Sequence, residues 1–104
     1  MRALILDSGL DRGSLAAARA LRADGWRVGI GSPIRGLAGT SRAVSGWHRV
    51  PAPGGGAEPF LAAAADALAQ GGYDVVFSSD DHGVLLLSEH RHRLPATVAY
   101  AAHE

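Results

Sequence analysis

Short apolar runs alternate with longer helical stretches along this sequence, and this alternation limits the possible folds more than any other feature. The first run, residues 3–6, leads into an alanine-rich helical stretch over residues 14–24. Further strand-like runs cover residues 26–30, 74–78 and 97–101. Repeated strand–helix–strand units favour an α/β fold. We therefore predict a Rossmann-like open, mostly parallel sheet of about 4–5 strands, with helices on both faces.

Residues that cap or break helices mark the predicted helix ends. Ser14 is placed to cap the first helix, and a glycine follows that helix at a left-handed position. A second helix begins near Glu58, with proline in its first turn, and ends at a pair of glycines. A third is predicted over residues 82–93, with Asp80 or Asp81 as its N-terminal cap.

Residues 31–53 have no clear periodicity and contain many glycines, serines and prolines. In one interpretation, residues 47–50 form a short edge strand within this segment. The segment also holds a local basic patch with no acidic residue, made of Arg35, Arg42, His48 and Arg49. Two interpretations of the patch remain open: a solvated loop surface, or contact with an anionic ligand or an acidic partner.

The composition limits the partners and the compartment. At 104 residues the sequence predicts a single domain over 1–104, and its formal net charge of zero argues against nucleic acid or a membrane surface as a partner. The absence of cysteine excludes disulfides and thiolate sites. No apolar run approaches a signal-peptide core or the roughly 20 residues of a transmembrane helix, so we expect a cytoplasmic protein. Heavy use of alanine and glycine, with arginine as the basic residue throughout, is typical of GC-rich bacterial coding.

Two polar loops follow predicted strands and are the candidate binding site. One follows residues 3–6 and the other follows residues 74–78. The carboxyl ends of parallel strands meet at one edge of a sheet, where amides at a helix start can meet an anion and aspartates can accept from an amine or hydroxyl. The predicted substrate-binding residues are Ser8, Gly9, Leu10, Ser79, Asp80 and Asp81.

Other chemistry is disfavoured by what the loops lack. The first loop offers only Gly9 and Gly13, which is not the dinucleotide fingerprint, and the chain contains no lysine for a Walker A loop. His82 and Glu89 share a predicted helix face but lie about 10 Å apart, which is too far for one metal ion. We therefore predict no catalytic, cofactor-binding or metal-binding residues in this chain. Helix capping remains the alternative role of the aspartates.

Several short segments, in a fixed order, carry a resemblance that covers nearly the whole chain. They are Asp7-Ser8-Gly9, Arg19-Ala20-Leu21-Arg22, Gly25-Trp26-Arg27-Val28, Leu37-Ala38-Gly39-Thr40-Ser41-Arg42, Tyr73-Asp74-Val75-Val76 and Ser79-Asp80-Asp81. In this order and spacing the sequence resembles the N-terminal pre-ATP-grasp domain of ATP-grasp ligases. The resemblance is strongest to the carbamoyl-phosphate-synthetase-like group of carboxylate–amine ligases.

The resemblance implies a partner and a division of labour. In that family, the domain packs against a separate ATP-grasp domain whose lysines and acidic residues hold ATP and magnesium, and a carboxylate is activated as an acyl phosphate. The sequence ends at about the point where that domain would begin. We therefore expect ATP and magnesium only with the ATP-grasp domain, no cofactor in this chain, and no activity from the chain alone. A bared apolar face near residues 85–87 and 98–102 is expected to favour a homodimer.

Two other function classes remain open. One is a free-standing Rossmann-like module that binds a small ligand or a protein. The other is the N-terminal sheet of a nucleotide-sugar transferase or dehydrogenase, against which the missing glycine fingerprint counts.

Overall fold

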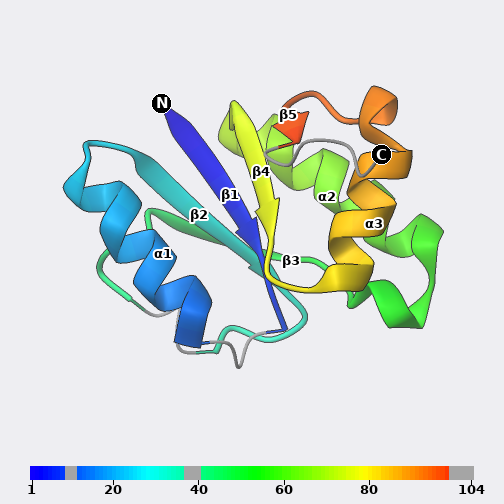
Figure 1. Ribbon diagram of the computed structural model, residues 1–104, viewed down its shortest axis with the longest axis horizontal. Coiled ribbons are helices and arrows are strands. Elements are labelled where there is room, and N and C mark those ends of the chain that lie inside the picture. The colour runs from blue at the N-terminus through cyan, green and yellow to red at the C-terminus, as the bar shows by residue number, and fades with distance from the viewer. Residues whose placement is uncertain (9–11, 37–40, 99–104) are drawn as a thin grey trace.

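The computed structural model describes residues 1–8, 12–36 and 41–98. They form a five-stranded, all-parallel sheet in the order β3-β2-β1-β4-β5 (Figure 1). The strands are β1 (Arg2–Leu6), β2 (Arg27–Ser32), β3 (Gly46–Arg49), β4 (Val75–Ser78) and β5 (Thr97–Val98). The predicted Rossmann-like α/β fold is confirmed.

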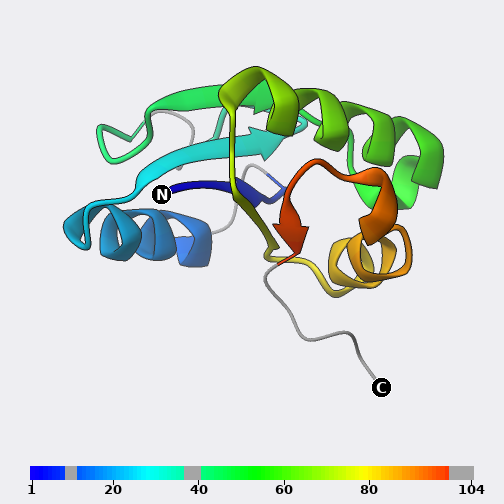
Figure 2. The same cartoon turned by 90° about the horizontal axis from the view of Figure 1, so that it is seen from above.

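Helices cover both faces of the sheet. The helices are α1 (Arg12–Ala23), α2 (Ala57–Gly71) and α3 (Asp81–Glu89), with short 3-10 turns at η2 (Pro53–Gly55) and η3 (Arg91–Arg93). Figure 2 shows α1 on one face and α2 and α3 on the other. The chain leaves β1 for β2 on one side and returns to β4 on the other, so the strand order reverses next to β1. That reversal is where open α/β sheets carry ligand sites.

The alternation of side chains along the strands builds one core on each face. Leu4 and Leu6 belong to the core under α2 and α3, whereas Ile5 belongs to the core under α1. The larger core also takes in Phe60, Leu61, Leu68, Val76 and Leu87. The alanine-rich α1 packs through Ala18, which is fully buried.

The short edge strand over residues 47–50 is real, with a slightly different start. β3 pairs in parallel with β2, with Gly29 opposite Gly46. The Ser45 amide donates to the Val28 carbonyl at 2.7 Å and extends this pairing at the amino end. Because β3 is parallel to β2, its carboxyl end delivers the following residues to the same edge as β1 and β4.

The helix ends confirm one predicted cap and correct two predictions. The Asp80 carboxylate accepts from the Gly83 amide at 3.3 Å, which confirms Asp80 as the cap of α3. The cap at Ser14 is wrong, because α1 begins at Arg12 and the Ser14 hydroxyl is buried with no hydrogen-bond partner among the described residues. The third helix ends at Glu89 rather than continuing to residue 93, since the backbone tightens into the 3-10 turn η3.

The face expected to be bare is mostly buried. Leu86, Leu87 and Val98 lie in the core, and only Leu85 is exposed among the described residues of that group. Residues 99–102, named in the same prediction, lie outside the described residues, as does the predicted end of the last strand. No helix in the described part of the chain is long and apolar enough to cross a membrane.

Candidate functional site

A cavity of about 490 Å³ lies at the carboxyl edge of the sheet, hereafter the carboxyl-edge cavity. Its polar lining comes from the ends of β1 and β4 and is formed by Asp7, Ser8, Ser78, Ser79 and Asp80. Its apolar lining includes Val50, Pro51 and Phe60, from the end of β3 and the start of α2. The cavity therefore sits where the strand order reverses.

Backbone hydrogen bonds fix the two polar loops to each other and to the sheet. The Ser79 amide donates to the Leu6 carbonyl at 3.0 Å, and the Asp7 amide donates to the Gly31 carbonyl at 2.9 Å. The Ser79 hydroxyl also donates to the Leu6 carbonyl at 3.4 Å. These bonds continue the parallel ladder beyond the strands, so the polar side chains stand on a rigid base.

The turn between β4 and α3 places Asp80 at the mouth of the cavity. The Asp80 amide donates to the Ser78 hydroxyl at 3.2 Å, and the Asp80 carboxylate caps α3. Gly83 lets the helix start approach β4, because a Cβ there would come within 2.3 Å of the Ser78 hydroxyl oxygen. The capping contact and the position in the cavity are compatible roles for one exposed carboxylate.

The charges in the cavity favour a ligand that donates hydrogen bonds. Asp7 is only 9% exposed, and Asp80 stands at the surface. No basic side chain is found among the described residues that line the cavity. An ammonium or hydroxyl group is therefore better matched than an anion.

The structure brings together three of the residues predicted for substrate binding. Ser8, Ser79 and Asp80 line the same cavity, which is what their places after parallel strands predict. Asp81 is exposed in the first turn of α3 and does not line the cavity. Gly9 and Leu10 lie outside the described residues. The predicted anion contact belongs to the amides at the start of α1, where neither Gly13 nor Ser14 lines the cavity.

The apolar wall was missed by the sequence analysis. Pro51 and Pro53 follow β3, and the sequence indicated them only as breakers of an irregular segment. The sequence feature that could have predicted this wall is the short edge strand at residues 47–50, which was one of two interpretations of the segment. Once that strand is taken as parallel, the residues after it must reach the carboxyl edge.

The basic patch does not contribute to this cavity. Arg35, Arg42 and Arg49 are exposed, and none of them lines the cavity. The Arg49 guanidinium lies 5.7 Å from the centroid of the Trp47 ring, a cation–π distance that holds it against β3.

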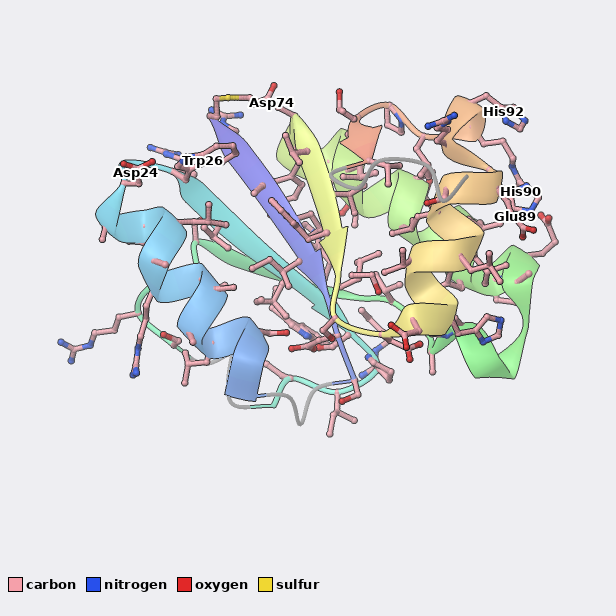
Figure 3. The ribbon with its side chains drawn as sticks, viewed as in Figure 1. Asp24, Trp26, Asp74, Glu89, His90 and His92 are labelled. Atoms are coloured by element: carbon pink, nitrogen blue, oxygen red, sulfur yellow. The ribbon has the colours of Figure 1, made fainter. Side chains whose placement is uncertain are left out.

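The polar residues at the far end of α3 form no metal site. Figure 3 shows Glu89, His90 and His92 at the end of α3 remote from the cavity, on the outer side of the molecule. The two histidine ring centroids are 6.4 Å apart. Within the described residues no group of three or more potential ligands is arranged to hold a metal ion.

Comparison with known proteins does not assign the chain to a family. A scan against protein-family models gives no match, and a search of curated proteins finds no significant similarity.

Proposed function

We propose that the chain is the N-terminal, substrate-positioning domain of an ATP-grasp carboxylate–amine ligase, and that the carboxyl-edge cavity holds the amine substrate. The observation that carries this proposal is the cavity lining, in which Ser8 and Asp7 after β1 meet Ser79 and Asp80 after β4. Ligands of open α/β sheets bind at this edge. The loops that form the cavity are also among the segments on which the family resemblance rests.

The lining residues suit an amine attached to a carbon chain. The carboxylates of Asp7 and Asp80 accept hydrogen bonds from an ammonium group, and charge makes those bonds stronger. Phe60 and Val50 offer an apolar surface to the carbon chain. By holding the amine in place, the domain lowers the entropic cost of its meeting the activated carboxylate.

The residues of this chain do not fit ATP. The chain has no lysine, and the Asp7 and Asp80 carboxylates would repel a polyphosphate. ATP and magnesium are therefore assigned to the ATP-grasp domain of the proposed ligase. This chain supplies binding and orientation, and no catalytic group.

The test is a steady-state assay of the chain joined to an ATP-grasp domain in its parent protein. ADP release should depend on an amine, and Asp80→Asn should raise the KM for the amine about fivefold while leaving the KM for ATP unchanged. Asp66→Asn is the matched control, because Asp66 is exposed on α2 and does not line the cavity.

Two results would contradict the proposal. If the protein binds amines through the cavity without amine-dependent ADP release, the chain is a free-standing small-ligand module. If Asp80→Asn and Asp66→Asn have the same effect on the KM for the amine, the cavity does not hold that substrate.

A further inference from the structure

A second cavity, of about 280 Å³, lies at the opposite, amino edge of the sheet, hereafter the amino-edge cavity. Its lining comes from the starts of β1, β2 and β3 and from the turn after α2, through Arg2, Arg27, Ser45, His48 and Tyr73. Figure 3 shows Asp74 beside this edge, where the strands begin. The length of the strands separates this cavity from the carboxyl-edge cavity.

Two arginines stand side by side at the cavity. Arg2 and Arg27 are direct partners in the parallel pairing of β1 and β2, so both side chains leave the same face of the sheet. Adjacent strands are about 4.8 Å apart, and like charges directly opposite each other are destabilising. Among the described residues, neither guanidinium forms an ion pair with an acidic side chain. An anion between them would relieve this repulsion.

The nearby acid does not occupy the cavity. The Asp74 carboxylate accepts from the Arg2 backbone amide at 3.0 Å. The Arg2 side chain instead donates to the Gly71 carbonyl at 3.4 Å. No acidic side chain is among the described residues that line the cavity.

Glycines hold a tyrosine hydroxyl at this cavity. Tyr73 is only 6% exposed, and a Cβ at Gly29 or Gly71 would come within 1.9 Å or 2.1 Å of its side chain. The Tyr73 hydroxyl oxygen is 2.8 Å from His48 Nε2. Burial raises the pKa of the Tyr73 phenol, and the Arg2 charge lowers it by less, so the hydroxyl stays protonated and remains a donor.

We propose that the amino-edge cavity binds the phosphate group of a small molecule between Arg2, Arg27 and the Tyr73 hydroxyl. Guanidinium groups present several N–H donors in a planar fork that matches phosphate oxygens. The phenol supplies a further donor from the buried side. The small volume of the cavity and the zero net charge of the chain favour a compact phosphate over a nucleic-acid backbone.

His48 couples phosphate binding to protonation. When neutral His48 accepts from the Tyr73 hydroxyl through Nε2, the phenol proton cannot be donated to the phosphate. When the ring is protonated, Nε2–H donates to the Tyr73 oxygen and the phenol proton is released for the phosphate. The charged and titratable groups around the ring are Tyr73, Asp66, Arg49, Arg2 and Arg27. Phosphate binding should therefore take up a proton.

The test is a titration of the isotope-labelled chain with inorganic phosphate, followed by the amide signals of Gly46 and Tyr73 and the guanidinium signal of Arg27. Arg27→Gln should raise the dissociation constant for phosphate about fivefold. The dissociation constant of Arg27→Lys should lie between those of Arg27→Gln and the wild type. Arg19→Gln, an exposed change on α1, is the matched control. Arg27→Gln removes one of two like charges, so its melting temperature without phosphate should not fall.

A second arm separates the sources of phosphate and tests the histidine. Tighter binding of glycerol 3-phosphate than of inorganic phosphate would identify the ligand as a phosphate ester, and equal binding would identify free phosphate. Sulfate does not titrate in the range of His48, so its affinity should rise as the pH falls, and His48→Gln should remove that dependence. The proposal is overturned if Arg27→Gln and Arg19→Gln bind phosphate equally well. It is also overturned if the shifts fall outside the cavity, or if duplex DNA binds more tightly than phosphate through Arg27.

Discussion

The cavities at the two edges of the sheet are lined by side chains of opposite charge, although the same strands build both edges. At the carboxyl edge Asp7 and Asp80 line one cavity, and at the amino edge Arg2 and Arg27 line the other. Helices α2 and α3 show the same division, because α3 begins beside Asp80 whereas α2 ends at Gly71, whose carbonyl accepts from the Arg2 side chain. A helix macrodipole favours acids at its start and cations at its end.

The opposite charges of the two cavity linings determine which kind of ligand each edge can bind. The start of a helix often binds an anion. At the carboxyl edge, however, the Asp80 carboxylate already caps the start of α3, so the cavity is suited to a ligand that donates hydrogen bonds. The amino edge has no such acid in the described cavity lining and suits an acceptor. Substitutions at each edge test this contrast.

The largest effect is expected from Gly29→Ala at the amino edge. The new Cβ would meet three atoms of the Tyr73 ring and hydroxyl within 2.9 Å, and Gly71 closes the space on another side of the ring. We expect a loss of about 3 kcal/mol in the free energy of unfolding, measured by urea denaturation. Gly54→Ala is the control, because nothing lies within 4 Å of its Cβ. Equal stability of the two variants would show that Tyr73 is not held as described.

A smaller loss is expected from Gly83→Ala at the carboxyl edge. The Cβ would displace the Ser78 hydroxyl from its hydrogen bond with the Asp80 amide, whereas alanine raises helix propensity by about 1 kcal/mol. We expect a net loss of about 1 kcal/mol in the free energy of unfolding, by the same urea measurement. A loss as large as that of Gly29→Ala would mean that the carboxyl edge is the more tightly packed of the two.

The two roles of Asp80 can be separated by paired substitutions. Asp80→Ala removes the cap of α3 and should cost about 1 kcal/mol of stability in thermal unfolding, whereas Asp80→Asn keeps a capping side chain and should cost much less. Asp81→Asn leaves both the cap and the described cavity lining intact. Equal melting temperatures for Asp80→Ala and Asp80→Asn would remove the capping role.

The smallest effect is a pH dependence at the amino edge. Burial lowers the pKa of His48 from 6.5, and the hydrogen bond to the Gln70 side chain offsets part of this change. The folded state disfavours the protonated His48 ring. The contribution of His48 to the stability of the fold is therefore complete above about pH 6.5, and it falls as the pH drops from 6.5 toward the lowered pKa of the folded state. His48→Gln should reduce this slope in a buffer without oxyanions. An unchanged slope would show that His48 does not titrate with folding.

The sequence predicts the fold best where a segment's own pattern decides its structure. β1, β2 and β4 are apolar runs between breakers, and the structure confirms each of them. β3 has a weak pattern because it is a partly exposed edge strand, held by its pairing with β2. The end of α3 was misplaced because the switch to a 3-10 turn at residues 91–93 depends on local hydrogen bonds that composition does not reveal.

The candidate site follows the same rule. Ser8, Ser79 and Asp80 are predictable because each follows a recognisable parallel strand. The wall at Val50 and Pro51 depends on the direction of β3, which the sequence leaves open. The amino-edge cavity was not predicted, since its residues come from segments far apart in the chain and meet only when the strand order is known.

An amine site at the carboxyl edge is tested most directly by titrating the labelled chain with alaninamide and with propionate. The first carries an ammonium group without a carboxylate, and the second carries a carboxylate without an ammonium group. We predict that alaninamide shifts the amide signals of Ser8, Ser79 and Asp80, that Asp80→Asn weakens this binding about fivefold, and that propionate leaves these signals unchanged. Binding of propionate in preference to alaninamide, or alaninamide binding that Asp80→Asn does not weaken, would contradict an amine site at this edge.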